Sequence, residues 1–185
     1  MVQINQKPLK KKVLITGPPR CGKSTLISQL IDYYINKKNY IIYGFLTPEI
    51  REGGNRIGFD ILDIYSGKRS QLSRVGNFKT KYKVGKYNVF VEEFDKYLDK
   101  TLKLEGKTVD LIIIDEIGKM ELFSKKFQDF IKKTFTSNIS ILASIGLKLQ
   151  HPLKNYLLNL PSVVLLNLNR QNSQLIFEKV ISLIS

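Results

Sequence analysis

"GPPRCGKST", at residues 17–25, lies between an apolar run and a segment whose apolar residues recur with helical spacing. It matches the pattern G-x-x-x-x-G-K-[ST] in full, and its two glycines let the backbone curl so that successive N–H groups point at phosphate oxygens. In this pattern Lys23 reaches the β- and γ-phosphates, and Ser24 offers its hydroxyl to Mg²⁺. The helix that follows adds the positive end of its dipole. The stretch therefore predicts a nucleotide site made of Gly17, Pro18, Pro19, Arg20, Cys21, Gly22, Lys23, Ser24 and Thr25.

The rest of the chain alternates short apolar runs with amphipathic segments. We expect strands at about residues 13–16, 40–46, 87–91, 111–114, 139–144 and 163–168, and helices at about residues 23–36, 92–104, 124–135 and from 173 onward. Residues 49–69 are expected to form two strands around a turn at 53–55, with a second turn at 66–67, so a β-hairpin is predicted there. This order predicts an α/β fold, with a mostly parallel sheet flanked by helices and a β-hairpin insertion. The length favours one domain, residues 1–185, whose residues 1–12 form a basic N-terminal arm.

Two carboxylates follow a run of four aliphatic residues at 111–114. Such a run is typical of a strand buried on both faces, and ligands of open α/β sheets bind at the carboxyl end of the strands. Asp115 is therefore expected to hold Mg²⁺ through a bound water, as the partner of Ser24. Glu116 is expected near the γ-phosphate, where it can accept a proton from an attacking water. Glu116 and Lys23 are accordingly our candidate catalytic residues.

Composition limits the class of protein further. The net charge is +14, with 30 Lys and Arg against 16 Asp and Glu, but the lysines are scattered, which favours a solvated lysine-rich surface over a nucleic-acid partner. No run approaches 18 apolar residues, and residues 1–12 carry lysines without the apolar core of a secretory signal. The single cysteine fits a reducing cytoplasm. His151 precedes Pro152 in an expected loop and is assigned to solvent. We therefore expect a cytoplasmic monomer with no membrane span.

Four of the six arginines, at positions 51, 56, 69 and 74, fall in one segment around the predicted hairpin. Arginine binds phosphate bidentately, so Arg51 or Arg56 could supply a cation to the γ-phosphate. The alternative is a surface hairpin whose arginines lie in water. Two further positions are equally open, because Arg20 and Lys119 can each contact phosphate or face solvent.

The whole chain resembles the thermophilic nucleoside-triphosphatase family, which includes the human cancer-related nucleoside-triphosphatase. The matching stretches are GPPRCGKST at 17–25, REGGNRIGFDI at 51–61, LSRV at 72–75, VGKYNV at 84–89 and IDEIGKMELFS at 114–124. The resemblance implies a single-domain, RecA-like P-loop fold. It also implies slow, Mg²⁺-dependent hydrolysis of several nucleoside triphosphates to diphosphate and phosphate. Lys119 and Glu121 belong to a matching stretch, but the sequence assigns them no role.

The chain departs from the family pattern at three places. Arg20 stands where the family tends to have a small residue, and Thr47-Pro48-Glu49 replaces the usual Thr-Glu-Glu. Asn172-Ser173 replaces a C-terminal Asn-Arg, so Arg170 would have to substitute for the missing arginine.

Two alternatives remain beside hydrolysis. The same loop could serve a nucleotide or small-molecule kinase, for which the arginine-rich hairpin is the only candidate lid. It could also serve a nucleotide-dependent switch protein that binds nucleic acid through the positive charge. The sequence contains no motif that reads a particular base.

Overall fold

The computed structural model describes residues 10–184. Most of the expected N-terminal arm lies outside these residues, but its last member belongs to the fold. Lys12 begins strand β1 (Lys12–Thr16), is fully buried and donates a hydrogen bond from Nζ to the Ser137 carbonyl oxygen at 2.8 Å. The boundary of the arm at residue 12 is therefore wrong. Lys12 belongs to the strand, and its buried ammonium group donates hydrogen bonds to backbone carbonyl oxygens.

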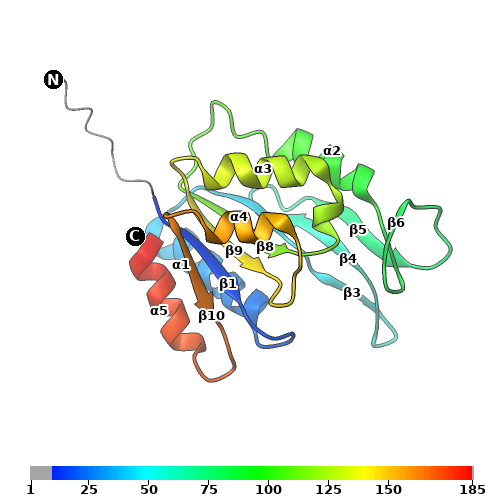
Figure 1. Cartoon of the computed structure of the whole chain (residues 1–185), viewed down its shortest axis with the longest axis horizontal. Helices are drawn as coiled ribbons and strands as arrows, with labels where there is room; N and C mark the ends of the chain where they lie inside the picture. The colour runs from blue at the N-terminus through cyan, green and yellow to red at the C-terminus, as the bar shows by residue number, and fades with distance from the viewer. Residues whose placement is uncertain (1–9, 185) are drawn as a thin grey trace.

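Within the described residues, ten strands form one sheet in the order β10-β1-β9-β8-β2-β4-β5-β7-β6, with β3 paired to β4. The first five strands of this order are parallel neighbours and form one side of the sheet, with β10 at its edge (Figure 1). They are β10 (Val163–Asn167), β1, β9 (Ser140–Ile145), β8 (Leu111–Ile117) and β2 (Ile42–Leu46). Strands β1, β8 and β9 are buried over nearly their whole length, as their aliphatic sequences require.

The insertion between β2 and the second helix continues the sheet with antiparallel strands. It comprises β3 (Glu49–Glu52), β4 (Asn55–Asp63), β5 (Arg69–Val75), β6 (Tyr82–Val84) and β7 (Tyr87–Val89). The sequence predicts a hairpin here, and the hairpin β3–β4 is present. The extension is larger than predicted because β5, β7 and β6 pair onward from β4.

Helices cover both faces of the sheet (Figure 1). One face carries α1 (Lys23–Lys38) and α5 (Ser173–Ile184), and the other carries α2 (Val91–Thr101), α3 (Lys125–Phe135) and α4 (Pro152–Leu158). Each face has its own apolar core, which includes Leu30 and Val180 on the first side and Phe94 and Phe127 on the second. This arrangement confirms the predicted α/β fold with flanking helices.

Two local expectations were wrong. Helix α2 ends at Thr101 rather than near residue 104. His151 does not lie in a loop: it caps α4, with Nδ1 accepting a hydrogen bond from the Leu153 N–H at 3.2 Å, and Pro152 occupies the first turn. Proline is well tolerated in the first turn of a helix, because the N–H that it lacks would have no hydrogen-bond partner there. None of the helices between residues 10 and 184 has the length and apolar character that a bilayer crossing needs.

Candidate nucleotide site

The phosphate-binding loop begins directly where β1 ends and closes into α1. Gly17 lies so close to the segment after β10 that a Cβ there would meet the Leu168 carbonyl oxygen at 2.3 Å. Gly22 caps α1 with φ of 102°, a left-handed conformation that favours glycine. Steric constraints therefore explain why both positions of the pattern are glycine. The first turn of α1 follows directly after the loop.

The side chains of this loop take different positions. Lys23 lies over the loop and donates from Nζ to the carbonyl oxygens of Gly17 and Pro18, each at 3.1 Å. Cys21 is buried beneath it as a free thiol, whereas Arg20 and Ser24 are exposed. Arg20 has φ of 62°, so a non-glycine residue holds a left-handed turn within the loop.

Asp115 lies at the carboxyl edge of β8 and is held from both neighbouring strands. Its Oδ2 accepts hydrogen bonds from the Thr47 backbone N–H at 3.1 Å and from Thr47 Oγ1 at 2.9 Å. Its backbone carbonyl oxygen accepts one from the Ser144 hydroxyl on β9. Asp115 is 4% exposed, so these contacts fix a buried carboxylate. Sequence reasoning missed Thr47 and Ser144. Their only signal was that each polar side chain falls at the carboxyl end of a predicted strand.

Glu116 and Glu121 flank Gly118. A Cβ on Gly118 would meet Glu121 Oε2 at 2.9 Å and Glu116 Oε1 at 3.1 Å, so both carboxyl groups lie against this residue. Glu121 begins the short 3₁₀ helix η1 (Glu121–Phe123), is buried, and accepts the Gly118 N–H at 3.1 Å. Burial, and then the field of Glu116, raise the pKa of the Glu121 carboxyl to about 8.

Glu116 is exposed to solvent, yet its pKa is also raised. The surrounding protein is the largest cause, the negative charge of Asp115 is the second, and the positive charge of Lys23 opposes both. The opposing effect of Lys23 is consistent with the two candidate catalytic residues lying at the same edge of the sheet, where β1 and β8 both end.

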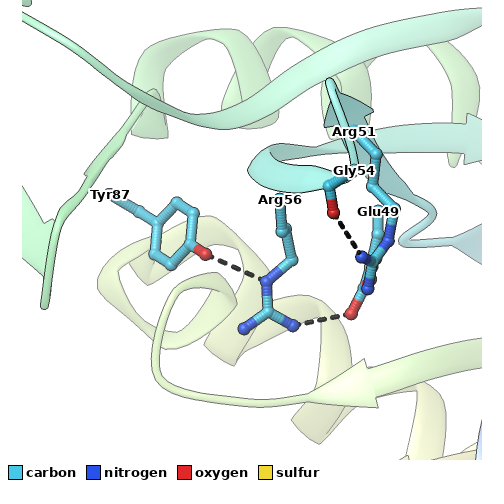
Figure 2. A network of polar contacts seen from close by, with 5 residues as sticks. All are labelled: Glu49, Arg51, Gly54, Arg56 and Tyr87. Atoms are coloured by element: carbon cyan, nitrogen blue, oxygen red, sulfur yellow. Dashed lines mark hydrogen bonds and ion pairs between the residues drawn. The ribbon is translucent and has the colours of Figure 1, made fainter.

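The hairpin arginines are engaged with acidic and aromatic partners (Figure 2). The Glu49 carboxylate accepts hydrogen bonds from Nε and Nη2 of Arg51. It also accepts one from Nη1 of Arg56, at 2.6 Å. Arg56 also donates from Nε to Tyr87 Oη at 2.9 Å, and Arg51 donates to the Gly54 carbonyl oxygen. A cation supplied by this hairpin to a γ-phosphate would first have to leave Glu49, so that role stays a prediction.

Two other candidate residues lie on loops at this edge of the sheet. Arg170 is exposed in the turn after Leu168, the residue that touches Gly17. The Asn169 and Asn172 side chains fix this turn, because each accepts a hydrogen bond from the other's backbone N–H, at 3.1 and 2.8 Å. Lys119 is exposed in the loop after β8. Both placements are compatible with phosphate contact and with solvent, and the alternatives remain open.

Comparisons with known proteins show which family and which solved structures this chain resembles. A family model described as NTPase matches residues 12–181. The chain is 38% identical over 173 residues to the nucleoside-triphosphatase THEP1 of Thermotoga sp. strain RQ2, covering 94% of this chain and 95% of that protein. It resembles the crystal structure of THEP1 from Aquifex aeolicus, with a TM-score of 0.79, 35% identity and coverage of 94% and 99%. It also resembles the solution structure of a human cancer-related nucleoside triphosphatase, with a TM-score of 0.76, 32% identity and coverage of 93% and 96%.

Proposed function

This chain belongs to the NTPase family, and on that basis we propose that it hydrolyses nucleoside triphosphates to diphosphate and phosphate, with Mg²⁺ as cofactor. The observation that carries the proposal is Glu116, whose carboxylate lies at the end of β8 within the field of Lys23. A phosphate-binding loop alone is common to many activities. A carboxylate directly after the buried Asp115, at the same edge of the sheet as the phosphate-binding loop, is the group that a water nucleophile needs.

The environment of Glu116 suits it to this task. A general base works best when its pKa approaches the pH at which it operates, and burial together with Asp115 moves the pKa of Glu116 upward. In the proposed reaction Glu116 accepts the proton of a water molecule while the water oxygen forms its bond to the γ-phosphorus. The bond from the γ-phosphorus to the β–γ bridging oxygen breaks, and the diphosphate leaves with that electron pair. Lys23 offsets the negative charge on the β- and γ-phosphates.

The side chains present fit Mg²⁺. Ser24 offers an exposed hydroxyl at the first turn of α1, and Asp115 offers a carboxylate held by Thr47, so both donors are oxygens, as this cation prefers. Among residues 10–184 no three His, Cys, Asp or Glu side chains gather into a metal cluster. Few protein ligands are typical of Mg²⁺, which takes much of its coordination from water and substrate phosphates. When bound, the ion would neutralise charge on the phosphate oxygens.

We further propose that several bases are accepted and that turnover is slow. The relatives carry the general name nucleoside-triphosphatase, without a single base. A hydrolase with no base preference would also account for a sequence that contains no motif dedicated to one base.

The test compares Glu116→Gln with the parent chain, using ATP and GTP in Mg²⁺ and resolving every nucleotide product and free phosphate. We expect turnover to fall by roughly 10²–10⁴-fold, the range for a lost general base, while nucleotide binding is retained. Glu105→Gln is the matched control, because Glu105 is exposed and forms a surface ion pair with Lys133, at 3.3 Å. Near-parent turnover in Glu116→Gln would remove Glu116 from its role. Phosphate appearing on an added nucleoside monophosphate would instead identify a kinase.

A further inference from the structure

A second pocket lies at the edge of the sheet opposite the phosphate-binding loop. It contains Tyr43, near the start of β2, and Lys107, in the loop that precedes β8. Asp115 and the loop after β1 lie at the other ends of these parallel strands, and Figure 1 shows the connection between α2 and β8 far from the loop that follows β1. This cavity of about 370 Å³ is therefore separate from the site described above. We call it the tyrosine pocket, and its defining residues are Tyr43, Tyr65, Lys68, Arg69, Lys100 and Lys107.

Two stacked rings form the wall of the tyrosine pocket. Tyr43 and Tyr65 lie nearly parallel, with ring centroids 4.6 Å apart and an interplanar angle of 10°. The Lys107 ammonium lies 4.7 Å from the centroid of the Tyr43 ring. Tyr43 is buried, whereas Tyr65 is 62% exposed and presents ring surface to solvent. A large aromatic ring held in place by a buried neighbour and left open outside is suited to stacking with a planar partner.

The lining of the tyrosine pocket is strongly basic. Five basic side chains and two acidic ones line it, and both acids are already bound. Asp63 accepts hydrogen bonds from Tyr97 Oη at 2.9 Å and from the Ser66 hydroxyl at 2.7 Å, and Glu93 accepts one from the Lys96 ammonium at 2.7 Å. Of the five cations, Lys96 is paired with Glu93 and Arg69 lies 3.8 Å from Asp60, so the exposed side chains of Lys68 and Lys100 supply the positive charge at the mouth of the pocket. An anion is favoured, and the stacked tyrosines add a preference for one that carries an aromatic ring.

The volume and solvent exposure of the pocket limit the kinds of ligand that it can bind. A cavity of about 370 Å³ lies near the lower end of small-ligand pockets and suits one nucleotide rather than several. Because Tyr65, Lys68 and Lys100 are all exposed, a strand could enter and leave on either side. Bases in a duplex are stacked on each other and are not available to Tyr65. We propose that the tyrosine pocket binds one nucleotide of single-stranded nucleic acid, with its base against Tyr65 and its phosphates near Lys68 and Lys100.

The test measures fluorescence anisotropy of a labelled oligothymidylate of about 12 nucleotides, with saturating ADP and Mg²⁺ present to occupy the other site. Tyr65→Ala should weaken binding by roughly 5- to 150-fold, the effect of losing one base–aromatic stack. Tyr65→Phe keeps the ring and should bind within about twofold of the parent chain. Lys100→Ala should lower the slope of log affinity against log salt by about 1, because one phosphate contact is lost, whereas Tyr65→Ala should leave the slope unchanged.

Tyr156→Ala is the matched control. Tyr156 is an exposed tyrosine on α4, with the Lys132 ammonium 6.0 Å from its ring centroid, so it pairs an aromatic ring with a cation outside the pocket. Its loss should leave affinity unchanged. Three results would overturn the proposal: an oligonucleotide that does not bind, equal affinity for Tyr65→Ala and Tyr156→Ala, or AMP binding as tightly as the oligonucleotide. The last would make a free nucleotide the ligand. None of these results depends on hydrolysis, so the proposal stands or falls separately from the proposed function.

Discussion

Replacing Glu121 by glutamine should remove a pH dependence of stability from this fold. Glu121 is buried, and its pKa in the folded chain is raised from an ordinary 4.5 to about 8 by burial first and by Glu116 second. Between these values the folded chain keeps a proton that the unfolded chain has released. The stability that Glu121 contributes is therefore fully present below about pH 4.5 and is lost as the pH rises toward 8.

The size of this effect follows from the two pKa values. At 1.36 kcal/mol for each pH unit, the full difference corresponds to ~5 kcal/mol. Over the two units from pH 5.5 to 7.5 the parent chain should lose roughly 2–3 kcal/mol through this group alone. Glutamine has nearly the same shape and can still accept the Gly118 N–H, but it does not titrate. Glu121→Gln should therefore lack this loss.

Urea denaturation of both chains across this pH range measures the difference, because titrating groups other than the acidic neighbours Glu116 and Asp115 contribute equally to each. Asp129→Asn serves as a control, since Asp129 is an exposed acid of α3 paired only loosely with Lys125, at 3.5 Å. Parallel pH profiles for the parent chain and Glu121→Gln would refute the reasoning. They would show that Glu121 is ionised when folded, and that its hydrogen bond with Gly118 outweighs burial.

Three further substitutions test other parts of the structure. Thr47→Val removes the hydroxyl that donates to Asp115 and should weaken Mg²⁺ activation by about 10- to 100-fold, as for other residues that orient a metal ligand; unchanged half-activation in a Mg²⁺ titration would contradict this. Gly44→Ala should destabilise the chain by at least about 3 kcal/mol in urea denaturation, because φ is 126° and the new Cβ would lie 1.8 Å from the Ile113 carbonyl oxygen. Lys23→Ala should weaken triphosphate binding more than diphosphate binding, measured by calorimetry, and equal losses would place its ammonium elsewhere.

The features that sequence reasoning predicted well are those encoded locally. The phosphate-binding loop is a contiguous pattern whose glycines have fixed conformational reasons, so Gly17 and Gly22 could be placed without a structure. Asp115 and Glu116 could be placed near the end of a strand, because the run of four aliphatic residues before them indicates a buried strand. In each case the information lies within a few neighbouring residues.

The features that it missed depend on pairing between distant segments. Thr47 holds Asp115 because β2 is the parallel neighbour of β8, and Ser144 reaches the same residue because β9 lies on the other side. Strand order cannot be predicted from any one of these segments alone. For the same reason the tyrosine pocket could not be predicted, since Tyr43 and Tyr65 come into contact only when β4 pairs antiparallel with β2. A polar residue at a strand end is a weak signal until its neighbours are known.

Strand pairing also changes how the positive charge should be understood. The arginines of the insertion suggest a phosphate-binding surface, but Glu49 binds Arg51 and Arg56, and Asp60 binds Arg74. Since only six of the 30 basic residues are arginine, most of the net charge of +14 is carried by lysine. A dispersed lysine field attracts any polyanion and is screened by salt within about 10 Å at 0.1 M. Weak oligonucleotide binding that disappears with added salt would reflect this field alone. Nonspecific attraction by lysines does not depend on an aromatic ring. A loss of oligonucleotide affinity in Tyr65→Ala at constant salt would therefore identify a specific binding site.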